Sequence, residues 1–151
     1  MKFDISDNGL CAAGGKAVAE GLKNNHIMTE LNLADNNLGK VGTRSDAAAD
    51  MSGVIAISNA IPTMGALTSL NISKNDLGQL VAEGWDFNNS RRAGAEWWHN
   101  DGRKRHTSDP PPEAKPEGAI ALAGAICASG ALVKFDVSDN DIRADGGKAL
   151  G

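Results

Sequence analysis

The stretch LNLADNNL at Leu31 to Leu38 occurs three more times in the chain with small changes. The other copies are FDISDNGL at Phe3 to Leu10, LNISKNDL at Leu70 to Leu77 and FDVSDNDI at Phe135 to Ile142. In each copy apolar residues alternate with polar ones, a pattern that predicts a short strand with one face in a core. Four copies of one phrase predict a stack of similar units in place of an ordinary globular fold.

Each copy also carries an asparagine just after its strand, and these are Asn8, Asn36, Asn75 and Asn140. An asparagine side chain both accepts and donates hydrogen bonds, so it can satisfy the backbone groups of a neighbouring turn. Because an unpaired buried backbone group costs about 1–3 kcal/mol, we predict that stacked asparagines form a structural ladder and are not ligands.

The spacing of these asparagines measures the repeat. Asn8 and Asn36 are 28 residues apart, the length of a unit with one strand and one full helix, whereas the next intervals are 39 and 65 residues. Two insertions follow, a polar loop near Lys40 to Asp50 and a long segment at residues 79–115. The helix between strands is predicted from apolar residues at i, i+1, i+4 and i+5, with a glycine before each at Gly14, Gly53 and Gly118. We expect these positions to pack in the core; they are Ala17, Val18, Gly21 and Leu22, then Ala56, Ile57, Ala60 and Ile61, then Ala121, Leu122, Ala125 and Ile126.

With these motifs the chain resembles the ribonuclease-inhibitor-like subfamily of leucine-rich repeat proteins. The resemblance implies an α/β solenoid of about three and a half repeats, with short parallel strands on a concave face and α-helices on a convex face. Residues 2–17 return at 134–149 with eleven of sixteen positions identical, which indicates a duplicated block. We therefore expect residues 1–151 to be a single leucine-rich repeat domain and a fragment of a longer array, with uncapped ends that allow self-association.

The composition and the motifs missing from the sequence argue against several classes of function. A formal net charge of −4 argues against general nucleic-acid binding. No apolar run suggests a signal peptide or a membrane span, so the expected location is cytoplasmic. The chain carries no phosphate loop, no HExxH and no nucleophile elbow, and neither Cys11 nor Cys127 has a partner at metal-ligand spacing; Cys127 is expected to be a small apolar residue. We therefore expect a non-catalytic module without cofactor or metal that binds a protein partner.

One candidate surface is formed by the outward residues of the strands. It is either a binding surface, on which Asp4, Asn32, Asn71 and Asp136 form a column suited to a basic partner, or a solvated face. The outward residues are Lys2, Asp4, Ser6, Glu30, Asn32, Ala34, Ser69, Asn71, Ser73, Lys134, Asp136 and Ser138, of which we select Asp4, Glu30, Asn32, Asn71, Lys134 and Asp136 as candidate partner contacts.

The long insertion is the second candidate, because it holds all three tryptophans together with a basic cluster. The aromatic residues either fold the insertion against the solenoid or present a binding surface, and the cluster is either a solvated loop or a nucleic-acid patch. The candidate contacts are Trp85, Trp97, Trp98, Arg103 and Arg105. The insertion weakly resembles a WW domain, which implies proline-rich peptide binding, although its second signature tryptophan is missing. A regulatory module like the repeat domain of Ran GTPase-activating protein is the other alternative.

Overall fold

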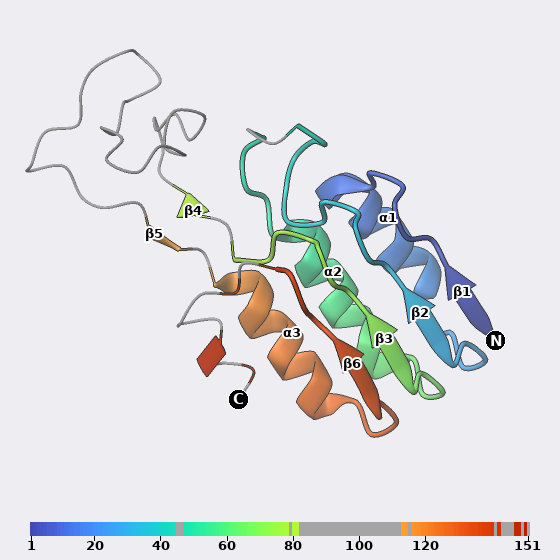
Figure 1. The fold of residues 1–151 in the computed structure, drawn as a ribbon. Coiled ribbons are helices and arrows are strands. Elements are labelled where there is room, and N and C mark those ends of the chain that lie inside the picture. The colour runs from blue at the N-terminus through green and yellow to red at the C-terminus, as the bar shows by residue number, and fades with distance from the viewer. Residues whose placement is uncertain are drawn as a thin grey trace, which may run out of the picture.

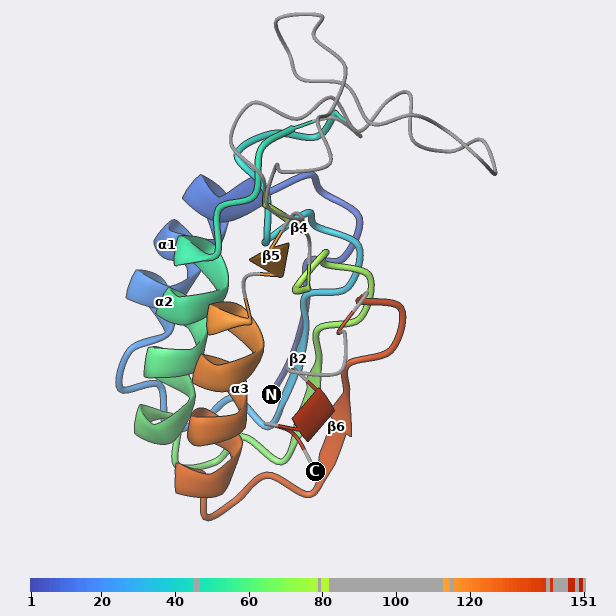
Figure 2. The ribbon, with the colours of Figure 1, turned by 90° about the vertical axis from the view of Figure 1, so that its left-hand side faces the viewer.

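A four-stranded sheet and the helices α1, α2 and α3 pack as two layers (Figures 1 and 2). The computed structural model describes residues 1–44, 47–78, 80–81, 113–114, 116–140, 142, 147–148 and 150. Its elements are β1 (Lys2–Asp4), α1 (Cys11–Leu22), β2 (Glu30–Asn32), α2 (Ser52–Ala60), the 3-10 helix η1 (Ile61–Thr63), β3 (Ser69–Asn71), β4 (Leu80–Val81), β5 (Glu113–Ala114), α3 (Glu117–Ala128) and β6 (Lys134–Asp136). The sheet covers one side and helices α1, α2 and α3 cover the other, so the predicted leucine-rich repeat solenoid is confirmed.

The four repeated phrases supply the four strands of one parallel sheet, in the order β1-β2-β3-β6. The register places Phe3 beside Leu31, Leu31 beside Leu70, and Leu70 beside Phe135. Equivalent residues of the phrase therefore lie in rows across the sheet. The insertions lengthen the connections between strands without disturbing this register.

The predicted asparagine ladder is present. Asn36 is buried, and its Oδ1 accepts the backbone N–H of Asn8 at 3.0 Å while its Nδ2 donates to the carbonyl of Ile5 at 2.9 Å. Asn75 binds the N–H of Asn36 in the same way at 3.1 Å, and Asn140 binds the N–H of Asn75. The residues flanking Asn36, Asp35 and Asn37, have φ of 57° and 54°. Short polar side chains tolerate this left-handed backbone, which turns the chain sharply around the buried amide.

The core lies between the two layers. Leu33 and Ile72, which directly follow β2 and β3, pack in one cluster with Ile57 and Leu122 from the helices, and each is at most 1% exposed. Because fully burying such a side chain contributes roughly 1.5–3 kcal/mol, this shared interior holds the repeats together.

Two details of the helices differ from the sequence prediction. Gly53 and Gly118 do not precede their helices but lie within the first turn of α2 and α3, and Gly14 lies within α1. Gly53 allows α2 to lie close to α1, since a Cβ at this position would lie 2.7 Å from the backbone of Ala12 in α1. Ala17 and Gly21 were predicted to be core residues but are exposed, because no described element packs beside α1 on that side.

The shorter insertion leaves and returns as a narrow loop. Lys40 and Ala49 form an antiparallel bridge, and the N–H of Val41 donates to the carbonyl of Ala48 at 3.0 Å. The expectation of an exposed polar loop is wrong for Lys40, whose Nζ lies 3.0 Å from Asp76 Oδ2 with its side chain 9% exposed. This ion pair fixes the base of the loop to the turn after β3.

Candidate functional site

The outward residues named from the sequence lie along one side of the sheet, which we call the strand face and define by the side chains of Lys2, Asp4, Ser6, Glu30, Asn32, Ala34, Ser69, Asn71, Ser73, Lys134, Asp136 and Ser138. Ser73 is the exception to the prediction, because it is buried. The register of the sheet aligns these residues in two rows across β1, β2, β3 and β6. One row is Lys2, Glu30, Ser69 and Lys134, and the other is Asp4, Asn32, Asn71 and Asp136. Six candidate contacts are brought together there, namely Asp4, Glu30, Asn32, Asn71, Lys134 and Asp136.

The other five candidates, Trp85, Trp97, Trp98, Arg103 and Arg105, lie outside the described residues. The structure describes the two ends of their insertion, where β4 pairs antiparallel with β5 and Leu80 lies opposite Ala114. The two ends of the insertion therefore leave and re-enter the solenoid at one place, between β3 and α3 (Figure 1).

A local hydrogen-bond motif recurs along the strand face. Oδ1 of Asp136 accepts both the N–H and the hydroxyl of Ser138, at 3.0 and 2.8 Å, and Asn71 does the same with Ser73. Asp4 holds Ser6 in this way too. Each carboxylate or amide therefore orients the start of its own turn through Oδ1, and its second polar atom takes no part in this motif.

These hydrogen bonds also affect acidity. The backbone N–H of Ser6 holds the pKa of Asp4 below its usual value of 3.8, with additional lowering by the Ser6 hydroxyl and the Asn32 amide. The N–H and then the hydroxyl of Ser138 lower the pKa of Asp136 likewise. Hydrogen bonds to the charged form favour it, so both side chains are anionic at neutral pH.

On the β1–β2 half of the strand face, polar side chains bind one another. Lys2 Nζ lies 2.8 Å from Glu30 Oε2, and Asn32 Nδ2 donates to Asp4 Oδ2 at 3.1 Å. The Oδ1 of Asn32 accepts the N–H of Ala34. This half therefore satisfies its own charges and amides.

On the β3–β6 half, the equivalent atoms are left over. Among the described residues, no partner binds Lys134 Nζ, Asp136 Oδ2 or Asn71 Nδ2. All three sit on adjacent strands, with Asn71 beside Asp136 in the register. This half thus offers a cation, an anionic oxygen and an amide donor to a molecule outside the described chain.

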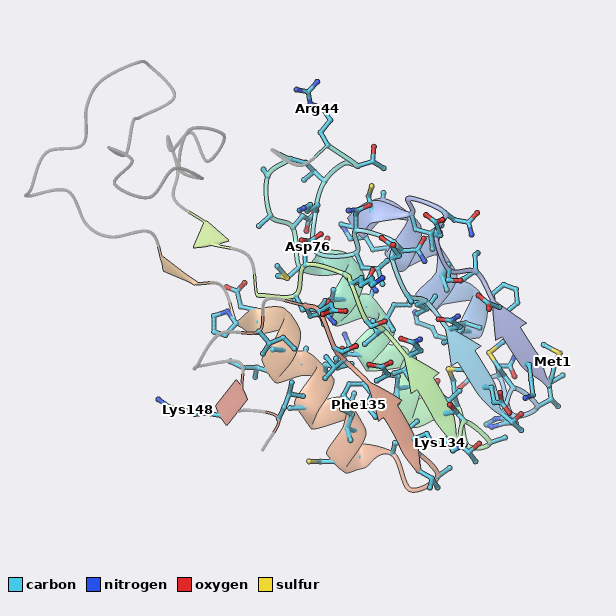
Figure 3. The ribbon with its side chains drawn as sticks, viewed as in Figure 1. Met1, Arg44, Asp76, Lys134, Phe135 and Lys148 are labelled. Carbon is cyan, nitrogen blue, oxygen red and sulfur yellow. The ribbon has the colours of Figure 1, made fainter. Side chains whose placement is uncertain are left out.

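A pocket of about 280 Å³ lies at the start of these strands, lined by Glu30, Thr68, Ser69, Val133 and Lys134. Its charged side chains have opposite signs, and Val133 is 82% exposed. Val133 and Thr68 were missed at the sequence level because they precede the strand phrase. The signal that could have found them is their position, because both lie directly before the predicted outward residues of their strands. There the N–H of Val133 donates to the carbonyl of Thr68. Figure 3 shows Lys134 on the outermost strand β6.

The side chains of the strand face are mostly polar. Its residues supply hydroxyls, amides, lysines and carboxylates, with neither histidine nor cysteine among them. The described part of the chain contains no group of three or more histidine, cysteine, aspartate or glutamate side chains that could hold a metal ion. Cys11 is buried, whereas Cys127, which was expected to be a small apolar residue, is exposed on α3. None of the described helices has the length and apolar character needed to cross a membrane.

Comparison with known proteins agrees with the architecture. A family model described as Leucine Rich repeat matches residues 24–44 and 132–151. The first match covers β2 with its asparagine turn, and the second covers β6 with Asn140. No curated protein matches the chain.

Proposed function

We propose that this leucine-rich repeat protein is a non-catalytic module that binds a protein partner on the β3–β6 half of its strand face. Leucine-rich repeat domains generally mediate protein–protein interaction. We assign the ribonuclease-inhibitor-like subfamily as well, because Asn8 and Asn36 are separated by 28 residues that include the full helix α1.

The observation that carries this proposal is the difference between the two halves of one face. Lys2 and Lys134 occupy the same row, yet Lys2 is bound to Glu30 while Lys134 has no described partner. Asp4 and Asp136 differ in the same way at their Oδ2 atoms. A polar group that is already bound gains little from a partner, whereas a free one can form a new charge-assisted hydrogen bond.

The same atoms define the partner's chemistry. It presents a donor to Asp136 Oδ2 and an acceptor to Lys134 Nζ and Asn71 Nδ2, so its contact segment has mixed polarity and is not simply basic. An apolar side chain of the partner covers Val133, which is 82% exposed beside the pocket. Apolar contact surrounded by polar rim contacts is the usual anatomy of such an interface.

Matched double variants test the site. We expect Lys134→Ala with Asp136→Asn to abolish capture of the proteins that the wild-type chain retains from extract. The control, Lys2→Ala with Asp4→Asn, removes the same groups from the paired half and should leave capture intact. Binding of a captured protein, once purified, is then measured directly by calorimetry. Equal capture by both variants, with equal circular dichroism, would contradict the assignment to β3–β6.

The tryptophan-containing insertion at 79–115 stays a second predicted contact surface, and the placement of residues 1–151 within a longer array stays a hypothesis. Replacing Trp97 and Trp98 by alanine separates packing from binding. Loss of stability indicates packing, whereas intact stability with lost capture indicates contact with the partner.

A further inference from the structure

The pocket on the strand face lies where a short side chain stands between two long ones. The row of residues that crosses β2, β3 and β6 is Glu30, Ser69 and Lys134. Together with Thr68 and Val133 these residues line the volume of about 280 Å³. Because neighbouring strands lie about 4.8 Å apart, the backbones that carry Glu30 and Lys134 are about 10 Å apart, with a serine between them. The pocket therefore arises from the sizes of the side chains in one row and not from an uncovered edge of the sheet.

The charged walls of the pocket do not bind each other. Oε2 of Glu30 lies 2.8 Å from Nζ of Lys2, which belongs to β1 on the other side of β2. Lys134 forms no ion pair within the described part of the chain. Since Lys2 compensates the charge of Glu30, the charge that remains without a counter-charge at the pocket is that of Lys134. An anionic group of a ligand can supply that counter-charge through a charge-assisted hydrogen bond.

The pocket also offers uncharged polar groups. The hydroxyl of Thr68 is already bound, because it donates to the carbonyl of Thr29 at 3.0 Å. The hydroxyl of Ser69 has no partner among the described residues, so it is a second donor next to Lys134 in the row. Oε1 of Glu30 has no such partner either and is an acceptor. Two donors and one acceptor therefore face a ligand.

Size and apolar surface limit what fits. The side chain of Val133 lines the pocket and is exposed, so it can contact an apolar group. Pockets for small-molecule ligands usually enclose about 300–1,000 Å³, so a volume of about 280 Å³ is at the lower limit of that range. It suits a single amino-acid residue better than a cofactor.

We propose that this pocket binds the C-terminal residue of the protein partner. The terminal carboxylate binds Lys134 and Ser69, the backbone N–H of the same residue binds Glu30, and its apolar side chain contacts Val133. A C-terminal residue carries these three groups on one carbon atom, so it can meet all of these contacts at once. Capture of a terminal carboxylate is a recurring mode of peptide recognition. The inference rests on the proposed function, because it names the part of the partner that this half of the strand face recognises.

Two other sources of a carboxylate fit less well. A glutamate or aspartate side chain within a partner segment brings the carboxylate, but its own backbone N–H lies several bonds away from it. A free amino acid carries an ammonium group that suits Glu30, but it has no further chain to reach Asn71 and Asp136 on the same half of the face. The C-terminal residue of a longer chain meets both requirements.

The test uses the full ¹⁵N-labelled chain and three acetylated peptides in NMR titrations. The first peptide, SGSAL, ends in a free carboxylate, the second is the same peptide with a C-terminal amide, and the third, SGSEL, combines a C-terminal amide with a glutamate side chain. We expect the first peptide to shift the amide signals of Ser69, Val133 and Lys134 until they saturate. The C-terminal amide should bind about fivefold more weakly, the upper range for an exposed charge pair.

Matched variants locate the contact. Lys134→Gln should lose the preference for the free carboxylate. Lys74→Gln removes an exposed lysine outside the pocket and should keep that preference. Ser69→Leu fills the pocket and should abolish the saturable shifts. Circular dichroism verifies that each variant chain is folded.

Saturable shifts that require both the terminal carboxylate and Lys134 support the proposal. Absence of saturable shifts, equal affinity for the first two peptides, or equally tight binding of the glutamate peptide or of free leucine overturns it. The proposed function is tested separately by capture of partners. Capture that is lost with Lys134→Ala and Asp136→Asn but retained with Ser69→Leu overturns the pocket assignment alone, whereas capture retained by both chains contradicts the proposed function as well.

Discussion

Replacing Asn75 by alanine should cost far more stability than the same change at Asn8, although both residues hold the same place in the repeat. Asn75 is 0% exposed. Its Oδ1 accepts the N–H groups of Asn36 and Leu38 at 3.1 and 3.2 Å, and its Nδ2 donates to three carbonyls.

The size of this stability loss depends on which backbone groups lose their only hydrogen-bond partner. The carbonyl of Leu33 still receives Asn36 Nδ2, and that of Ile72 still receives Asn140 Nδ2, so neither is orphaned. The N–H groups of Asn36 and Leu38 have no other acceptor in the described chain. At about 1–3 kcal/mol for each unsatisfied buried group, Asn75→Ala should lower the free energy of unfolding by about 4 kcal/mol.

Asn8 is the matched control. It is exposed, and its Nδ2 donates to the carbonyls of Ile5 and Ser6. The Ile5 carbonyl keeps Asn36 Nδ2 as a donor, and the Ser6 carbonyl can bind water. We therefore expect Asn8→Ala to cost less than about 1 kcal/mol.

Urea unfolding followed by far-ultraviolet circular dichroism measures the difference, since the helices α1, α2 and α3 give a signal for the folded solenoid. Small domains have total stabilities of about 5–15 kcal/mol, so an alanine variant that is largely unfolded should be measured in a stabilising osmolyte. Equal losses for Asn75→Ala and Asn8→Ala would refute the assignment of stability to the buried ladder.

Three further predictions follow from the packing, the acidity and the thiols. Gly53→Ala should destabilise the chain by about 1–3 kcal/mol in urea unfolding, because its Cβ would lie 2.7 Å from the Ala12 backbone; Gly21→Ala, where a Cβ meets nothing within 4 Å, should be neutral or stabilising, and equal effects would contradict the close α1–α2 contact. The carboxylates of Asp4 and Asp136 have lowered pKa values, so the stability they contribute is present above a pH of about 3.8 and is lost as the pH falls through their folded pKa values. Ser138→Ala should therefore raise the pKa of Asp136 in a carboxyl NMR titration. An unchanged pKa would count against the turn motif. Iodoacetamide should alkylate exposed Cys127 before buried Cys11, as mass spectrometry of partly labelled chain would show, and the reverse order would contradict the burial.

The repeat phrase predicts the strands correctly because each strand and its asparagine turn depend on residues close in sequence, and it predicts the ladder because stacked copies of the phrase bring equivalent asparagines together. Leu31 and Leu33 alternate with Asn32, and one asparagine follows, so the strand and its turn are encoded within eight residues. The helix face is predicted less well. Ala17 and Gly21 have helical spacing, but spacing does not say whether a neighbouring helix covers them.

Other features have no local signal. Lys40 and Asp76 lie in different repeats, and only the stacking of the turns brings their charged atoms to 3.0 Å. Val133 lies outside the repeated phrase, and its place beside the pocket depends on the row that β3 and β6 share.

The tripeptide KFD separates what the sequence determines from what the tertiary structure decides. Its alternation makes it a strand at both β1 and β6, because that property resides in the chain itself. Whether its lysine and aspartate are paired depends on the strand alongside, which is Glu30-Leu31-Asn32 for β1, whereas the outer edge of β6 has no strand beside it among the described residues. The repeat class was therefore readable from sequence, while the free groups of the strand face emerged only from the order of the strands, since pairing is a property of neighbours in space.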